Sequence, residues 1–204
     1  MRRTLRSLSC IILLFAFAAC SSGHQLQPLN NDAVILAFGD SLTYGTGAPQ
    51  DKSYPAVLEQ LSGRKVVNAG IPGEVTAGGL ARLADTLEEV RPQLVILCLG
   101  GNDMLRRVSS EETAQNLEQM VAISRAQGVP VLLLGVPRPA LFGLESAPFY
   151  HELAEKMELP LEDEIISSVL SDSNLKSDQI HPNAEGYRLI AEAIREKLKE
   201  SGAL

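Results

Sequence analysis

Short apolar runs alternate with amphipathic stretches along most of this chain. Four of the runs are rich in Val, Ile and Leu, and they cover residues 33–38, 65–69, 94–99 and 129–134. None of them alternates strictly between apolar and polar residues, which is typical of strands that are buried on both faces of a parallel sheet. We therefore expect these four segments to be strands of one parallel sheet.

The stretches between the runs carry apolar residues at helical spacing. Three stretches each predict a helix with one apolar face. The apolar residues of the first are Leu80, Leu83, Ala84, Leu87 and Val90, and those of the second, which follows a capping box Ser109…Glu112, are Leu117, Met120 and Val121. Those of the third are Tyr187, Ile190, Ala191, Ile194 and Leu198. In the third stretch, charged residues such as Glu185 and Arg195 face away from the stripe. Strands that alternate with helices predict an α/β sandwich with right-handed crossovers.

The first residues form a segment of a different kind. Met1–Arg6 is basic, and an apolar run from Cys10 to Cys20 is followed at once by polar residues. This run is short for a bilayer span, so we interpret residues 1–19 as a secretory signal peptide that is cleaved off. The alternative is an N-terminal anchor that is not cleaved. Residues 20–32 are expected to be a tether, and residues 33–204 a single domain.

The cleavage point has two interpretations. Phe17-Ala18-Ala19-Cys20 resembles a bacterial lipobox, and cleavage there would leave a lipidated Cys20 as a membrane attachment. Ala16-Phe17-Ala18 also fits an ordinary site that would release a soluble protein. We expect an exported protein, either a lipoprotein on the periplasmic side of a bacterial membrane or a soluble periplasmic or secreted protein.

Charge and cysteine content narrow the classes of partner. The formal net charge is −7, and no basic run follows the signal segment, so a nucleic acid is not an expected partner. Loss of Cys10 and lipidation of Cys20 would leave Cys98 alone, and one cysteine with scattered histidines builds neither a disulfide nor a zinc site. We expect no metal and no cofactor, and we interpret Cys98 as a small core residue.

Ser41 follows the first expected strand, in Gly39-Asp40-Ser41-Leu42. These residue types are common in turns, and Thr43 stands where a Gly-x-Ser-x-Gly nucleophile elbow has its second glycine. A serine hydroxyl is a weak nucleophile until a base takes its proton. Ser41 is therefore a candidate nucleophile only if the fold brings a base to it.

His181 is the best candidate for that base among the three histidines. His24 lies in the expected tether, and His151 lies on a predicted helix, where a surface or half-buried position is favoured. Asp178 precedes His181 by three residues and could hold its Nδ1–H and stabilise the imidazolium formed during attack. Asp178 could also be a helix cap, a role that we assign to Asn183.

Three groups could donate to a developing oxyanion. Asn102, in Gly100-Gly101-Asn102-Asp103 after the third strand, offers a side-chain amide, and Gly73, after the second strand, offers a backbone N–H. The backbone N–H of Ser41 is the third donor. The carboxyl ends of parallel strands meet at one sheet edge, where ligands bind in such folds. Taken singly, Asn102 could be a turn or cap residue and Gly73 a turn glycine.

Together these segments resemble the conserved blocks of the SGNH (GDSL) hydrolase family, in particular its small bacterial esterase and lysophospholipase L1/thioesterase I branch. The matching blocks, in order, are residues 37–45, 68–73, 99–103 and 178–183. The resemblance implies Ser41 as catalytic serine, Gly73 and Asn102 as oxyanion donors, and Asp178 and His181 as acid and base. One departure is Glu74, which directly follows Gly73. The resemblance also implies a three-layer α/β/α sandwich with a flavodoxin-like, mostly parallel sheet of five strands.

The sequence therefore predicts a serine esterase that hydrolyses acyl esters through an acyl-enzyme, of the arylesterase, lysophospholipase or acyl-thioesterase type, with a small-molecule ester or lipid as substrate. Candidate substrate-binding residues are Met104, Leu105, Pro139 and Phe142, which are apolar enough to hold an acyl chain but equally suited to ordinary packing. Arg106, Arg107 and Arg138 could meet an anionic head group or face solvent.

Two alternatives stay open from the sequence. A carbohydrate or peptidoglycan O-acetyl esterase would use the same residues with a shallow polar pocket. A non-catalytic binding lipoprotein would keep the fold without a working site.

Overall fold

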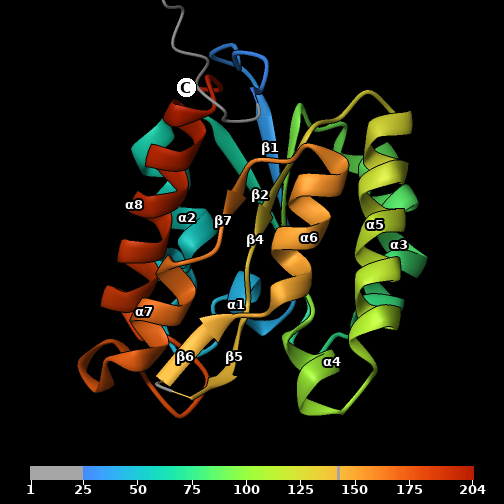
Figure 1. Cartoon of the computed structure of the whole chain (residues 1–204). Helices are drawn as coiled ribbons and strands as arrows, with labels where there is room; N and C mark the ends of the chain where they lie inside the picture. Colours follow the sequence, from blue (N-terminus) through green and yellow to red (C-terminus); the bar gives the residue numbers. More distant parts are fainter. Residues whose placement is uncertain (1–24, 142) are drawn as a thin grey trace, which may run out of the picture.

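A five-stranded parallel sheet forms the middle layer of the protein. The computed structural model describes residues 25–141 and 143–204, and the strand order is β2-β1-β3-β4-β7 (Figure 1). The strands are β1 (Val34–Gly39), β2 (Lys65–Gly70), β3 (Leu94–Cys98), β4 (Val131–Leu134) and β7 (Leu161–Glu162). This order is the flavodoxin-like one, and the four strands expected from apolar runs are confirmed.

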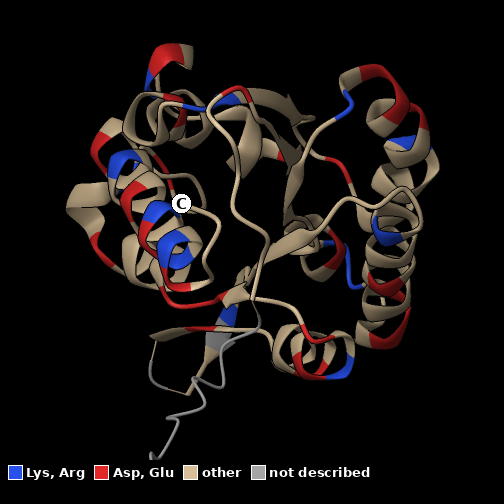
Figure 2. Ribbon diagram, turned by 90° about the horizontal axis from the view of Figure 1, so that it is seen from above, with Lys and Arg blue, Asp and Glu red and all other residues tan. Residues whose placement is uncertain are grey.

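Helices cover both faces of the sheet and complete a three-layer sandwich, as predicted (Figure 1). One face carries α2 (Tyr54–Ser62), α7 (Ile165–Ser171) and α8 (Ala184–Glu200), and the other carries α3 (Thr76–Val90), α5 (Ser110–Ala126) and α6 (Pro148–Met157). Charged residues lie mainly on the outer helices, and the sheet between the helix layers is almost free of them (Figure 2). The central strands are therefore buried on both faces, which explains their unbroken apolar runs.

The last helix shows how the sequence pattern becomes packing. All five residues of its predicted stripe are buried in the core, from Tyr187 to Leu198. The Asn183 side chain caps the helix, because its Oδ1 accepts from the backbone N–H groups of Glu185 and Gly186, at 3.0 Å each. At the start of α5 the Ser109 hydroxyl accepts from the N–H of Glu112, so both predicted helix starts are confirmed.

Three strands were not expected from the apolar pattern of the sequence. The strands β5 (Pro137–Ala140) and β6 (Gly143–Ser146) pair as an antiparallel hairpin outside the main sheet. Proline cannot donate a backbone hydrogen bond to a neighbouring strand and is confined to the edges of sheets. Pro137 and Pro139 therefore argued against a strand in this segment. The edge strand β7 has only two residues, too few for a periodic signal.

Short helices and turns connect the sheet to the loops at its carboxyl edge. Helix α1 (Ser41–Tyr44) begins two residues after β1, and α4 (Gly101–Leu105) follows β3. Two 3-10 turns cover Gln50–Lys52 and Ser173–Leu175. The carboxyl edge therefore carries most of the irregular structure, and it is the lower edge in Figure 1.

The opposite edge of the sheet holds the two ends of the described chain. Leu26 is buried, its N–H donates to the carbonyl of Ser201 at 2.7 Å, and the N–H of Leu29 donates to the carbonyl of Ala203 at 2.9 Å. The described part of the expected tether thus packs on the end of α8. The predicted signal peptide and Cys20 lie outside the described residues. Within residues 25–141 and 143–204, no helix has the length and apolarity needed to cross a membrane.

Candidate active site

The candidate residues meet at the carboxyl edge of three neighbouring strands. Ser41, Gly73 and Asn102 follow β1, β2 and β3, and His181 lies in the loop before α8 (Figure 1). Gly39 makes the first of these turns possible, because a Cβ at this position would collide with Thr43 Oγ1 and with the carbonyl oxygen of Cys98. The glycine lets α1 turn closely over the end of β3 and place Ser41 at the edge.

Ser41, His181 and Asp178 form one hydrogen-bonded chain. His181 Nδ1 lies 2.8 Å from Asp178 Oδ2, and His181 Nε2 lies 3.0 Å from Ser41 Oγ. Because a carboxylate only accepts, Nδ1 of a neutral ring carries the proton, and Nε2 then accepts from the serine hydroxyl. The ring is thus oriented to take the Ser41 proton. This chain joins residues 140 positions apart in the sequence.

Asp178 is held in the loop by its own neighbours. Its Oδ1 accepts from the backbone N–H groups of Ile180, at 2.8 Å, and His181, at 2.9 Å. Burial acts to raise the pKa of Asp178, but these bonds and the His181 ring outweigh it and hold the pKa below its ordinary value. Asp178 therefore stays a carboxylate at neutral pH and can balance an imidazolium.

The side-chain amide of Asn102 lies between two acceptors. Its Nδ2 donates to Asp40 Oδ2 and to the carbonyl oxygen of Glu74, at 3.0 Å each. Asp40 is buried, its Oδ1 accepts from the N–H of Leu42, and burial raises its pKa to about 6. Asp40 was not singled out from the sequence. The signal available was a carboxylate beside the candidate serine, at the end of a largely buried strand.

Gly73 adopts a backbone conformation that favours glycine. Its φ is +79°, a region in which a side chain is strained, and its carbonyl accepts from Arg106 Nη2 at 2.7 Å. The next residue, Glu74, is paired with Arg82 of α3. The sequence did not predict the Glu74–Arg82 pair either, because no sequence pattern links a residue in a loop to one on a helix.

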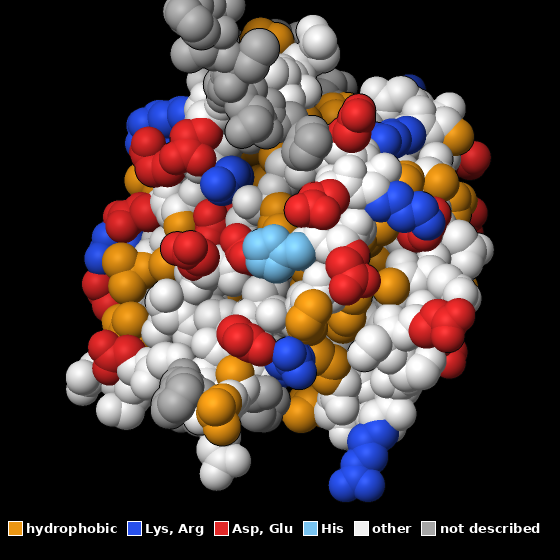
Figure 3. Space-filling view, in the orientation of Figure 1, with side chains coloured by type: hydrophobic (Ala, Val, Ile, Leu, Met, Phe, Trp, Pro, Cys, Tyr) orange, Lys and Arg blue, Asp and Glu red, His pale blue; other side chains and the backbone are white. Residues whose placement is uncertain are grey.

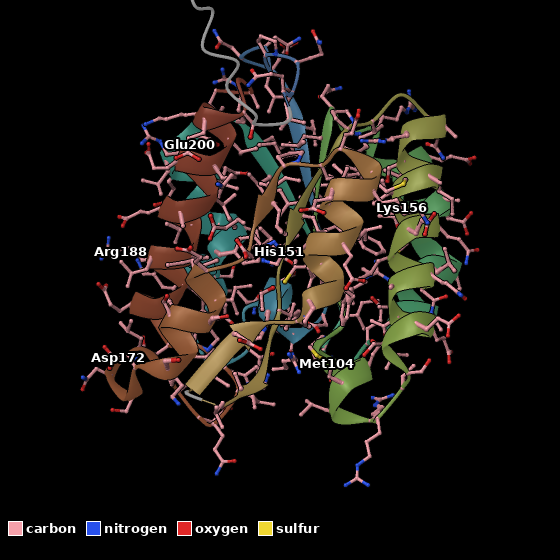
Figure 4. The ribbon with its side chains drawn as sticks, viewed as in Figure 1. Met104, His151, Lys156, Asp172, Arg188 and Glu200 are labelled. Carbon is pink, nitrogen blue, oxygen red and sulfur yellow. The ribbon has the colours of Figure 1, made fainter. Side chains whose placement is uncertain are left out.

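An apolar cavity opens beside Ser41 and His181. It has a volume of about 490 Å³, and its apolar lining comprises Leu42, Met104, Leu105, Val136, Pro137, Leu144, Leu170 and Ile180. Figure 4 places Met104 on α4 at the lower end of the molecule. Of the other candidate residues, the side chain of Pro139 and the whole of Phe142 lie outside the described part of the structure. Arg107 and Arg138 also line the cavity.

The second histidine of the described chain lies away from this site. His151 sits on α6, well above the lower edge (Figure 4), and its Nε2 is 2.6 Å from Asp163 Oδ2. Its side chain is 57% exposed, in agreement with the expected surface position. A hollow of about 680 Å³ beside it includes neither Ser41 nor His181, so it is separate from the chemistry despite its larger volume. Among the described residues, no group of three or more His, Cys, Asp or Glu side chains could hold a metal ion.

Comparisons with known proteins identify the family of the chain. Residues 37–189 match the model of the GDSL-like lipase/acylhydrolase family. The chain is 33% identical over 172 residues to the thioesterase 1/protease 1/lysophospholipase L1 of Escherichia coli strain K12, covering 81% of this chain and 83% of that protein. It is 29% identical over 198 residues to the arylesterase of Vibrio mimicus, covering 92% and 95%. The fold resembles the crystal structure of TesA, with a TM-score of 0.74 and 31% identity over 81% of this chain and 98% of that one.

Proposed function

Since the chain belongs to the GDSL-like lipase/acylhydrolase family and is a carboxylic ester hydrolase, we propose that Ser41 is its nucleophile, His181 its general base and Asp178 the group that orients the base. One observation carries this proposal: His181 Nε2 lies 3.0 Å from Ser41 Oγ while Nδ1 contacts Asp178. This arrangement activates a serine without a metal or a cofactor.

The reaction follows from these contacts. Ser41 Oγ attacks the ester carbonyl as its proton moves to His181 Nε2, and the tetrahedral intermediate collapses when His181 protonates the leaving alcohol. The acyl group is then bound to Ser41 as an ester. A water molecule gives a proton to His181 as it attacks the acyl-enzyme. The bond from the acyl carbon to Ser41 Oγ then breaks as His181 returns the proton to Oγ, and the carboxylic acid leaves. Asp178 stays ionised throughout and stabilises the imidazolium.

The oxyanion would be held by the backbone N–H groups of Ser41 and Gly73 and by the Asn102 amide. Ser41 is the first residue of α1, so its N–H has no acceptor within that helix. Both hydrogens of Asn102 Nδ2 already face acceptors, Asp40 Oδ2 and the Glu74 carbonyl. Asn102 would therefore share one of these hydrogens with the oxyanion. The backbone N–H groups of Ser41 and Gly73 are the donors that are free before substrate binds.

The apolar lining of the cavity supports an acyl chain rather than a sugar as the group bound beside Ser41. Its apolar residues come from α1, α4, the β5–β6 hairpin and the residue before it, α7, and the loop before His181. A carbohydrate O-acetyl esterase would instead need polar side chains around a larger polar substrate. Aryl esters of increasing acyl length test this point: rising kcat/KM with length supports an acyl pocket, and a strict preference for acetate contradicts it.

Substitution of the nucleophile tests the mechanism. Ser41→Ala is expected to lower esterase turnover by at least about 10⁴-fold. It should also abolish labelling by a fluorophosphonate, which reacts with an activated serine. Ser168→Ala, on the surface of α7, serves as the matched control and should behave like the unmodified protein. Wild-type turnover in Ser41→Ala would overturn the assignment and favour a non-catalytic binding protein.

We propose further that the protein is exported and that Cys20 carries a lipid. The support is the basic start, the apolar run and the lipobox-like Phe17-Ala18-Ala19-Cys20. Mass spectrometry of the mature N-terminus tests the proposal, because lipidation adds the mass of a diacylglyceryl group at Cys20 and Cys20→Ser removes it. A mature chain that begins after Ala18 would instead show release as a soluble protein.

A further inference from the structure

Exposed large hydrophobic side chains gather at the carboxyl edge of the sheet. Six such side chains are exposed in the described part of the chain, and five of them lie at this edge: Tyr44, Ile71, Leu105, Leu141 and Ile180. The sixth, Leu61, lies on α2. We call the five residues the apolar rim. Leu141 is 89% exposed and Leu105 is 63% exposed, so these side chains extend well beyond the protein surface.

The apolar rim is built by the fold and not by one hydrophobic segment. Tyr44 ends α1, Ile71 follows β2, Leu105 ends α4, Leu141 is at the tip of the β5–β6 hairpin, and Ile180 directly precedes His181. In Figure 3, hydrophobic side chains reach the lower margin of the molecule, where Figure 1 places this hairpin. Single exposed hydrophobic residues need no explanation, but five separate segments that each present one at the same edge do.

The rim is continuous with the opening of the cavity beside Ser41. Leu105 and Ile180 line that cavity, and Leu141 lies three residues from Leu144, which also lines it. A protein bound over this surface would close the route by which substrate reaches Ser41. A layer of amphiphiles would keep the route open, because its own molecules are the ones that enter.

Basic side chains accompany the apolar ones. Arg106 and Arg107 are exposed directly after Leu105, although the whole chain is acidic, with a net charge of −7. Apolar side chains flanked by arginines suit the boundary between acyl chains and anionic head groups. The two arginines beside Leu105 therefore favour an anionic lipid surface over a neutral one.

We propose that the apolar rim inserts into the surface of an anionic lipid layer, so that an acylated substrate passes into the cavity without crossing bulk water. Insertion needs only the rim and the arginines. Delivery of substrate to Ser41 rests in addition on the proposed function.

Tryptophan fluorescence tests insertion directly, since the chain contains no tryptophan. Leu141→Trp places a single reporter in the rim, and Leu61→Trp is the matched control on α2. Vesicles of phosphatidylcholine and phosphatidylglycerol should shift the emission of Leu141→Trp to the blue and lower its acrylamide quenching constant by about two-fold or more. Leu61→Trp should not respond. Equal responses from both positions, or none from Leu141→Trp, overturn the proposal.

Two further measurements separate docking from catalysis. The Trp response of Leu141→Trp should persist in a Ser41→Ala background, because insertion does not use the nucleophile. The double variant Ile71→Ser/Leu141→Ser, with neither residue in the cavity lining, should lower turnover of a long-chain ester presented in vesicles by about ten-fold. Its turnover of a water-soluble aryl acetate should stay within about two-fold of wild type. An unchanged rate on vesicles would contradict the role in substrate delivery.

Discussion

The Arg82 guanidinium and the Glu74 carboxylate form a two-point ion pair beneath the loop that carries Gly73. Arg82 Nε donates to Glu74 Oε1 at 2.7 Å, and Nη2 donates to Oε2 at 2.6 Å. Nη2 also donates to the carbonyl of Ala69 at 2.9 Å, and the guanidinium lies 3.9 Å from the centre of the Phe38 ring. Arg82 thus ties the Gly73 loop to the ends of β1 and β2.

Loss of this tie should impair the chemical step more than substrate binding. The backbone carbonyl of Glu74 holds Asn102, and Gly73 precedes Glu74, so Arg82→Met would release two of the proposed oxyanion donors. Because removing one donor costs about 10²–10³-fold in rate, we expect kcat to fall about 10- to 100-fold with KM nearly unchanged. Steady-state kinetics on an aryl ester measures the two constants.

The matched control is Arg188→Met, which removes a surface arginine that pairs with Glu185 and Glu192 on α8. It should leave both constants near wild type, because exposed ion pairs contribute little. If Arg82→Met and Arg188→Met had the same kcat, the Arg82–Glu74 pair would have only a structural role.

Asp178→Asn should lower kcat by about 10⁴-fold while the protein stays folded. An amide at this position could donate to His181 Nδ1, which would place the ring proton on Nε2. A protonated Nε2 cannot accept the proton of Ser41. Asp163→Asn is the control, since it changes a second His–Asp contact, with His151, outside the site. Circular dichroism would verify folding, and a similar kcat in the two variants would exclude Asp178 from the mechanism.

Gly73→Ala tests the left-handed backbone conformation in the loop that carries this proposed oxyanion donor. Gly73 and Gly128 have φ values of +79° and +75°, and an added Cβ would meet only Arg106 Nη2, at 3.7 Å, in the first case and no atom within 4 Å in the second. Both substitutions should cost about 1–2 kcal/mol of unfolding free energy through backbone strain. Only Gly73→Ala should also lower kcat, measured at a temperature where both variants are folded.

A loss of kcat in Gly128→Ala equal to that in Gly73→Ala would show that general destabilisation, and not the position of the Gly73 N–H, explains the effect.

Asp40 should make the protein less stable as the pH rises from 4 to 6. Its folded pKa, about 6, lies above the ordinary value of 3.8, so the folded state binds more protons than the unfolded state across this window. The contribution of Asp40 to the unfolding free energy is therefore most favourable below pH 4. Between pH 4 and pH 6 this contribution should decrease by up to about 3 kcal/mol. Urea unfolding at several pH values measures it.

Asp40→Asn removes this titration while it keeps an acceptor for the N–H of Leu42. The difference in unfolding free energy between wild type and Asp40→Asn should therefore shift in favour of the variant as the pH rises through the window. A difference that is constant between pH 4 and 6 would show that Asp40 does not titrate there. Asp178 has a lowered pKa, so its effect on stability has the opposite sign: its contribution is lost as the pH falls below the ordinary pKa of 3.8.

Much of this molecule was readable from local patterns. The runs at residues 33–38 and 94–99 predicted central strands, because a strand covered on both faces must be apolar throughout. The stripe from Tyr187 to Leu198 and the cap at Asn183 predicted α8, because helix periodicity and capping depend only on near neighbours along the chain. The order of Ser41, Asn102, Asp178 and His181 then indicated the chemistry and the family.

Tertiary structure decided the rest, and the reason is distance along the chain. The bond between Asp40 and Asn102 spans 62 residues, and nothing in either segment specifies that the amide turns toward the buried carboxylate rather than toward solvent. The β5–β6 hairpin and the two-residue strand β7 are too short or too rich in proline for a periodic signal. The apolar rim likewise arises only when five separate segments of the chain meet at one edge of the sheet. Sequence alone therefore determined the layers and indicated the candidate reacting groups, whereas the orientation of the proposed donors and the surface around the cavity follow from long-range packing.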